Sequence, residues 1–504
     1  MPSQNRGLGS DDMRSSPDRT HKQERGGGRE VFRKAGHTLA LVGTGVVVGV
    51  VVLAPFPLAS VEWGWIAWWG VLLAISTPLL DYSYLMKTQV RFLGTVLGAS
   101  TVLAIFLLMQ ATGFLGLLPE HLLFTETRAL IGQPVAGYAS AVPAQSLLVV
   151  GGFALALLTF CACFVAGSNP KLARLILFSV AIAGTANGLL GLYLNYQDPT
   201  QLLWRKLDIP KGQPSGTFTN RNHAATLFAS CAAIFFSVAV QRFLAVIPRG
   251  RMSLKSRLMI VMLNNPPQIG AALVLFITAL GLTFATGSRG GLLALLCGLF
   301  TAYALLVVRS FGARLGALLA GGGAMLGVAF LSQVGLGSIG ERFAEVRLSE
   351  DGRSEVYKAV LRMIRDNPWF GTGAGTFEMV FPRYRPDTIS PSGIWDYAHS
   401  SPLQVIAELG IPAGILALGI LVGIIGLCIW GSLNRRRDQV IPVIGASVGV
   451  AGLVHSFVDF SLQIPGFMIV YAAVLGVAAA QSFPTRRAGD RSKAVSSAPS
   501  VERR

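Results

Sequence analysis

Long uncharged apolar runs alternate with short polar segments along most of the chain. Each run is close to the roughly 20 residues that a helix needs to cross a hydrocarbon core of about 30 Å. Only helices satisfy their backbone groups in lipid without closing a barrel. The pattern therefore predicts an all-α, polytopic membrane helix bundle of about twelve transmembrane helices. The expected spans lie at about 36–54, 64–81, 93–113, 146–167, 172–194, 224–246, 269–287, 290–308, 314–333, 403–430, 440–458 and 466–482.

Polar segments at both ends of the sequence bound the membrane domain. Residues 1–34 and 484–504 are rich in small and charged residues and show no apolar periodicity. Segments of this kind do not bury enough apolar surface to fold. We therefore expect two disordered tails on either side of a membrane domain at 35–483.

One polar segment interrupts the second half of the membrane domain, at about 334–402. Loops of that length are functional or disordered more often than simple connectors. Inside it, apolar residues recur at helical spacing and predict an amphipathic helix that ends at Asn367-Pro368. Ser401-Pro402 then predicts the N-cap and first position of the next span. The apolar face of the loop helix is expected to consist of Val356, Val360, Leu361 and Ile364.

The distribution of positive charge gives the orientation in the membrane. The net charge is +17, from 42 Lys and Arg against 25 Asp and Glu, although only 13% of residues are charged. Cytoplasmic loops of membrane proteins carry the excess of Lys and Arg. The basic clusters fall in alternate loops, so both termini are expected in the cytoplasm and 334–402 outside. These clusters lie at 29–34, 87–91, 171–174, 242–257, 309–314 and 435–437.

Composition also excludes several kinds of partner. No basic patch is interleaved with aromatic residues, so we expect no nucleic acid partner and assign the charge excess to topology. The five cysteines all lie inside apolar runs, where cysteine behaves as a small hydrophobic residue. No clustered His, Cys, Asp or Glu has metal-ligand spacing. We expect neither a metal nor a cofactor, and the lipid bilayer is the first expected partner.

Several arginines lie on the outward side, against the general trend of charge, and the candidates for chemistry among them are Arg221, Arg289 and Arg353. An Arg next to lipid is costly and needs a partner or access to water. In one interpretation, each side chain extends to the membrane–water interface, where its charged end stays in water. In the other, it binds an anionic ligand. Guanidinium matches phosphate in a bidentate way and stays charged, so several such residues together favour an anion.

Other polar residues near the outward ends of the spans are candidates for chemistry. His399 lies at the mouth of the 403–430 span and is either a proton acceptor for a hydroxyl or a hydrogen-bonded structural residue. Glu408 lies two turns inside that span, where it holds an Arg, orients a polar partner or forms a buried structural pair. His455 and Asp459, four residues apart, form either a structural cap or part of the site lining.

Four motifs resemble the O-antigen ligase and O-antigen polymerase superfamily, over about residues 200–480. They are Gly216-Thr-Phe-Thr-Asn-Arg-Asn-His223, Gly287-Ser-Arg-Gly290, Gly371-Thr-Gly-Ala-Gly-Thr-Phe377 and Ala398-His-Ser-Ser-Pro-Leu-Gln-Val-Ile-Ala-Glu-Leu-Gly-Ile-Pro412. Their order, and the large outward loop between the ninth and tenth spans, carry the resemblance. The third motif lacks the Lys of a phosphate-binding P-loop and predicts a tight turn.

The resemblance implies a GT-C-like glycosyltransferase of the bacterial inner membrane that works without a metal. Such enzymes transfer a glycan from an undecaprenyl diphosphate carrier to an acceptor hydroxyl on the periplasmic side. The acceptor is lipid A-core for ligases, another lipid-linked glycan for polymerases, and a protein for some relatives.

Carried over by position, Arg221 and Arg289 would hold the diphosphate, and His399 would be the general base or position the acceptor. Arg353 matches a frequent Arg of the loop helix and is expected to bind substrate, as are His223, Glu408 and His455. Ligase and polymerase activity both remain open.

A transporter or lipid flippase is the main alternative. Twelve spans with both termini inside fit many transporters, but those folds usually show internal repeats and helices broken near the midplane. The sequence shows neither clearly, and its polar candidates gather on one side. A structural subunit of a polysaccharide export machine is a third interpretation, which would not require the Arg and His residues to converge.

Overall fold

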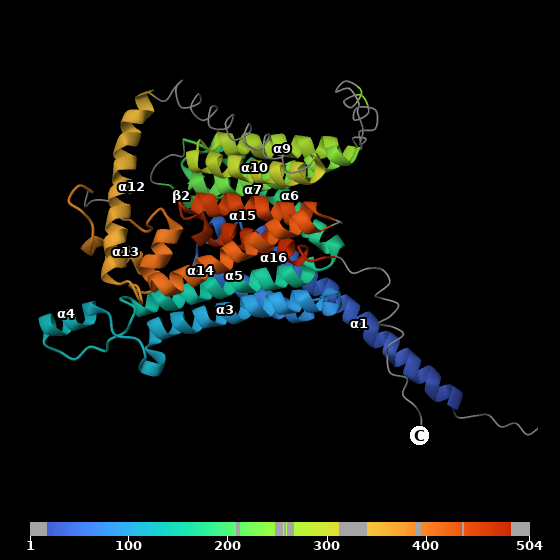
Figure 1. The fold of residues 1–504 in the computed structure, drawn as a ribbon, viewed down its shortest axis with the longest axis horizontal. Coiled ribbons are helices and arrows are strands. Elements are labelled where there is room, and N and C mark those ends of the chain that lie inside the picture. The colour runs from blue at the N-terminus through green and yellow to red at the C-terminus, as the bar shows by residue number, and fades with distance from the viewer. Residues whose placement is uncertain are drawn as a thin grey trace, which may run out of the picture.

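The chain folds as a bundle of long, nearly aligned helices (Figure 1). This computed structural model describes residues 18–207, 212–246, 256, 259, 267–311, 340–389, 395–435 and 438–484. Within these ranges there are fourteen α-helices, and the sheet structure amounts to a single hairpin of two-residue strands, β1 (Gln201–Leu202) and β2 (Arg205–Lys206). The prediction of an all-α membrane bundle is confirmed.

Eight helices are long and apolar enough to cross a membrane, and three shorter apolar helices accompany them. Eleven of the twelve predicted spans therefore correspond to helices, while the twelfth, 314–333, lies outside the described residues. The long helices are α1 (Asp18–Leu53, apolar from Ala35), α3 (Lys87–Thr112), α5 (Pro143–Gly167), α6 (Pro170–Gln197), α7 (Arg221–Val246), α9 (Pro267–Ala285), α10 (Arg289–Phe311) and α14 (Ser401–Asn434). The shorter helices are α2 (Trp63–Ser76), α15 (Val440–Ser456) and α16 (Pro465–Ala480).

Two helix boundaries differ from the sequence-based ones. Helix α1 begins at Asp18, inside the segment expected to be a disordered tail. That segment contains several Lys, Arg, Glu and Gln residues, which favour helix, and it continues from a membrane span that has already nucleated one. At α14 the N-cap is Ser400, with Pro402 within the first two helical positions, so the predicted cap at Ser401 is one residue too late.

Helices α7, α15 and α16 form the interior of the bundle. Helix α7 packs against α9, α10 and α15, while α16 packs against α5 and α15. Small residues allow this close approach, as they do between helices in lipid generally. A Cβ on Gly445 of α15, for example, would lie only 2.1 Å from the side chain of Ala478 on α16.

The segment at 334–402, which is predicted to lie outside, contains a helix that stands across one end of the bundle. We name this end the outward end after that prediction. This helix, α12 (Gly340–Asp366), lies beside α13 (Phe377–Val380) and at the opposite end from the N-terminal part of α1 (Figure 1). It ends just before Asn367, as predicted. Val356 and Val360 are fully buried, but Leu361 is 54% exposed, so its predicted place on the apolar face is wrong. Positions 356, 359, 360 and 363 follow the three-and-four spacing of one helix face, and position 361 does not.

Helix α4 (Leu122–Ile131), which the sequence pattern does not predict, lies at the same end of the bundle (Figure 1). Arg383, in the segment after α13, forms a bidentate pair with Glu126 of α4, at 2.6 and 2.9 Å. The segment between α3 and α5 is therefore part of the outward cap of the bundle.

Helix α14 is broken near its outward end, a feature that its sequence alone does not show. Gly410 has φ +78° and ψ 167°, outside the helical region. The peptide N–H of Ile411 donates to the carbonyl of Pro368 at 2.7 Å instead of to its own helix. A Cβ on Gly410 would lie 2.4 Å from the carbonyl oxygen of Trp369, so only glycine fits where these two segments cross.

The distribution of Lys and Arg predicts which ends of the helices face each compartment. In a background without the native cysteines, Cys at the exposed position Thr388 should react with a membrane-impermeant maleimide in intact spheroplasts. Cys at the exposed position Asn434, at the other end of α14, should react only after the membrane is opened. The reverse labelling pattern would invert the topology.

Candidate active site

A buried carboxylate, that of Asp459, lies in the turn after α15 at the outward end of the bundle. Asn222 donates its side-chain amide to Asp459 Oδ2 at 2.6 Å, and the N–H of Phe460 donates to Oδ1 at 2.8 Å. His223 Nε2 and His399 Nδ1 both lie 3.5 Å from Oδ1. One carboxylate thus joins α7, the turn after α15 and the segment that enters α14.

The environment of Asp459 favours its ionised form. Burial by itself works against ionisation, since the residue is only 2% exposed. The neighbouring His223 and His399 outweigh that effect and hold the pKa of Asp459 well below its usual range. The carboxylate therefore stays negatively charged at neutral pH. It favours a proton on the ring nitrogen of each histidine that faces it.

His399 is held by its backbone as well as by its ring. Its φ is +52°, in the left-handed region that a non-glycine residue adopts at a cost and that is often found at functional sites. The hydroxyl of Tyr357 on α12 donates to the His399 carbonyl at 3.0 Å. The ring lies edge-on to Trp395 and Phe460. With Nδ1 turned to Asp459, Nε2 is left to accept a proton, as in a base oriented by a carboxylate.

His455 on α15 has its protonation pattern set by a chain of hydroxyls. Thr226 donates its one hydroxyl proton to the carbonyl of Asn222 at 2.9 Å, so Ser461 must donate to Thr226 at 3.2 Å. His455 Nδ1–H then donates to Ser461 Oγ at 3.0 Å. Its Nε2 is a buried acceptor without a hydrogen-bond partner in the described structure, and it faces Gly290 at the start of α10.

Arg221 and Arg289 are the first residues of α7 and α10, and both side chains are exposed. Arg221 hydrogen-bonds to the side-chain oxygen of Gln213. The Gln213 amide in turn lies against Gly287, where a Cβ would come within 2.8 Å of it. The two arginines are thus brought to neighbouring positions, each at a helix N-terminus whose dipole also favours an anion.

Arg353 approaches the same cluster from α12, one turn before Tyr357. Burial raises the pKa of Tyr357. The positive charge of Arg353 lowers this pKa, while the negative charge of Asp459 raises it. Arg353 also lies within electrostatic range of His455. Helix α12 therefore brings both a cation and the hydroxyl that holds the His399 backbone.

Glu408 is hydrogen-bonded to polar partners within the protein. Its carboxylate accepts the peptide N–H groups of Gly375 at 2.8 Å and Phe377 at 3.2 Å. It also accepts the side-chain amide of Gln404 at 3.1 Å, while Gln404 Oε1 accepts the N–H of Ala398 at 3.0 Å. These contacts make Glu408 an anchor that links the glycine-rich turn to the peptide next to His399.

The glycine-rich turn itself uses its amides within the protein. Thr372 N–H donates to the carbonyl of Ala407 and Gly373 N–H to the carbonyl of Glu408. A tight turn, as the missing lysine predicts, is what the structure shows. In the part of the chain described here, no group of three His, Cys, Asp or Glu side chains is arranged to hold a metal ion.

Six of the seven predicted site residues converge at the outward end of the bundle. These are Arg221, His223, Arg289, Arg353, His399 and His455. The carboxylate between them is Asp459, which the sequence predicts as either a helix cap or part of the site lining. Its contacts with His223 and His399 could not be predicted from the sequence. The contacts of Asn222 with Asp459 and of Tyr357 with His399 join segments that are far apart in the sequence, so the local sequence does not show them.

One comparison with known protein families gives a match. Residues 274–418 match the family model described as O-antigen ligase. The matched segment contains Arg289, Arg353, His399 and Glu408 but ends before Asp459. A search of curated proteins gave no match. Within this multi-pass membrane protein, residues 274–418 are therefore similar to the O-antigen ligase family, in agreement with the resemblance of its motifs.

Proposed function

We propose that this protein transfers a glycan from an undecaprenyl diphosphate carrier to an acceptor hydroxyl at the periplasmic face of the bacterial inner membrane, without a metal. The family implies an enzyme of the ligase or polymerase type acting on lipid-linked glycans. The observation that carries the finer proposal is the position of His399 on the Asp459 carboxylate, beside three arginines. This is an acid–base group placed next to an anion site.

The proposed reaction is a displacement at the anomeric carbon of the donor glycan. The acceptor oxygen forms the new bond to that carbon, and its proton passes to His399 Nε2. The bond between the anomeric carbon and the phosphate oxygen breaks, and undecaprenyl diphosphate leaves with the electron pair. Asp459 stabilises the imidazolium that forms, as a buried carboxylate does in other carboxylate–histidine pairs.

The arginines supply the electrostatic part of the mechanism. Negative charge grows on the diphosphate as the bond breaks, and fixed cations aimed at that charge lower the barrier. Arg221 and Arg289 lie at two helix N-termini and meet the diphosphate, while Arg353 approaches from the side of α12. A site at the outward ends of membrane helices gives a lipid-linked donor access from the bilayer and a glycan access from the periplasm.

The Arg289→Lys variant should fold but lose most of its activity. Lysine keeps the charge but not the planar fork that binds phosphate in a bidentate way. Losing one charged hydrogen bond predicts a fall in kcat/KM of about tenfold or more, measured with purified protein and lipid-linked donor. Arg383→Lys, an exposed arginine at the same end of the molecule, is the matched control. Full activity of Arg289→Lys would mean that the residue only reaches the membrane surface.

The His399→Ala variant should bind the donor but transfer it at least about 10²-fold more slowly, which is the effect of losing a general base. His399→Gln should restore little, because an amide forms hydrogen bonds but does not take the proton. If His399 were structural, Gln would be tolerated, and Ala would lower the yield of folded protein together with activity. Normal turnover by folded His399→Ala protein would remove this residue from the mechanism.

The Asp459→Asn variant tests the orientation of the base. Asparagine has the same shape but carries no charge to stabilise the imidazolium, so kcat should fall at least about tenfold, with donor affinity retained. Between pH 7 and 5 the wild-type carboxylate stays ionised, because its pKa is depressed. The comparison is therefore made at pH 7, where the wild-type carboxylate carries its charge. A folded Asp459→Asn protein with wild-type kcat would contradict this role for the carboxylate.

A further inference from the structure

A short turn at 215–218 leads into α7. The hydroxyl of Ser215 donates to the carbonyl of Phe218 at 2.6 Å, and the N–H of Phe218 donates to the carbonyl of Ser215 at 3.0 Å. Gln213 lies just before this turn and Arg221 just after it, and their side chains are hydrogen-bonded to each other. The position of Arg221 therefore depends on what holds the turn at 215–218 in place.

The turn is held through Thr217, whose side chain is fully buried. Its hydroxyl accepts the side-chain amide N–H of Asn187 on α6 at 2.7 Å and donates to the carbonyl of Pro55 at 2.7 Å. The N–H of Thr217 donates to Asn187 Oδ1 at 3.2 Å. Asn187 is itself fully buried, and a Cβ on Gly216 would lie 2.2 Å from its Oδ1. Two segments from much earlier in the sequence thus hold the turn before α7.

Pro55 opens a strained turn, at 55–60, in the connection between α1 and α2. Leu58, Ala59 and Ser60 have φ angles of +51°, +56° and +55°, and all three residues are buried. Residues other than glycine adopt this left-handed conformation at a cost, and as single residues more often than in succession. Such strain persists only where the surroundings determine the conformation.

Contacts on two sides hold the turn at 55–60. Trp69 Nε1 on α2 donates to Ser60 Oγ at 2.9 Å, and Ser60 Oγ donates to the carbonyl of Ala54 at 2.6 Å. A Cβ on Gly466, at the start of α16, would lie 2.7 Å from the carbonyl oxygen of Ala59, so the turn also packs closely on α16. The carbonyl of Pro55 is therefore a fixed acceptor for the Thr217 hydroxyl.

From these contacts we infer that Asn187 and the turn at 55–60 position Arg221 through Thr217. The inference rests on the proposed function, in which Arg221 binds the diphosphate. Thr217 and both of its partners come before the segment that matches the O-antigen ligase family, 274–418. The helices before α7 thus set the position of a diphosphate ligand. They are positioning elements, since they act through Arg221 and supply no group that contacts the substrate.

The Thr217→Val variant keeps the shape of the side chain but removes its hydroxyl. The Pro55 carbonyl and the Asn187 amide then lose a buried partner, and Arg221 loses its fixed position. The dissociation constant for undecaprenyl diphosphate, measured on purified protein by native mass spectrometry, should rise about tenfold. Thr217→Ser keeps the hydroxyl and should bind like the wild type.

A double-mutant cycle separates positioning from a general loss of stability. If Thr217 acts through Arg221, adding Thr217→Val to Arg221→Ala should raise the dissociation constant no further. Ser60→Ala removes the hydroxyl that holds the strained turn, so it tests the same connection where Thr217→Val does not fold. It should show the same loss of affinity and the same lack of additivity.

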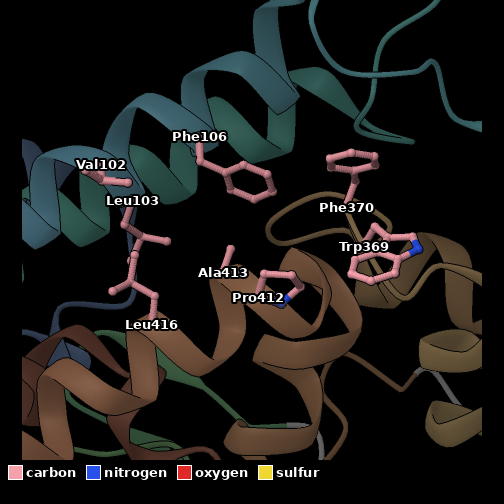
Figure 2. A pocket seen from close by; sticks show the side chains of 8 residues that line it. All are labelled: Val102, Leu103, Phe106, Trp369, Phe370, Pro412, Ala413 and Leu416. Carbon is pink, nitrogen blue, oxygen red and sulfur yellow. The ribbon is translucent and has the colours of Figure 1, made fainter.

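Two control variants lie outside this network. Thr159→Val removes a buried hydroxyl that donates within its own helix, α5, to the carbonyl of Leu155. Leu103→Ala removes buried apolar contacts in the groove between α3 and α14 (Figure 2), and α3 packs against α5 and α14. Leu103→Ala should lower the melting temperature, and both controls should bind undecaprenyl diphosphate like the wild type.

Wild-type affinity in a folded Thr217→Val or Ser60→Ala protein would overturn the inference. Additive losses in the cycle, or wild-type affinity in Arg221→Ala, would overturn it as well, because the network would then position no diphosphate ligand. A wild-type protein that binds undecaprenyl diphosphate but forms no glycosidic bond would instead count against the proposed function, and the binding cycle would still decide the inference.

Discussion

The arrangement of the outward end depends on one buried negative charge. An ionised carboxylate inside a protein is stable only when it is paired and hydrogen-bonded. Asp459 meets this requirement through Asn222 and His223 of α7, the peptide of Phe460 and His399 from the segment before α14. Satisfying that charge fixes three parts of the chain relative to one another. It also gives His399 the orientation that a proton acceptor needs.

The fold was largely predictable because lipid imposes a simple rule on sequence. A run of about 20 apolar residues specifies a spanning helix whatever its neighbours are, and eleven predicted spans match helices. The details that failed are those set by packing between distant segments. Leu361 is exposed because α12 turns a different face to α14. Gly410 breaks α14 because Trp369 crosses it, and the sequence of α14 alone does not show that contact.

The residues that meet at the outward end could be predicted from the sequence, but their contacts could be predicted only in part. Arg221, Arg289 and His399 stand out because polar side chains are rare at the outward ends of apolar helices, and the structure brings them together. Glu408 stands out for the same reason, yet it anchors the turn at Gly375. A buried carboxylate that binds substrate and one that anchors a turn look the same in sequence, since the difference lies in which donors the fold brings to them.

The central claim is that this cluster transfers a glycan away from a diphosphate carrier, and the product balance tests it most directly. Purified protein in nanodiscs is given undecaprenyl diphosphate-linked glycan and an acceptor, and both products are quantified by mass spectrometry. The account predicts one undecaprenyl diphosphate released for each glycosidic bond formed, in the presence of a metal chelator. Glycan that crosses the membrane still attached to its carrier, with no diphosphate released, would contradict the account and identify a transporter.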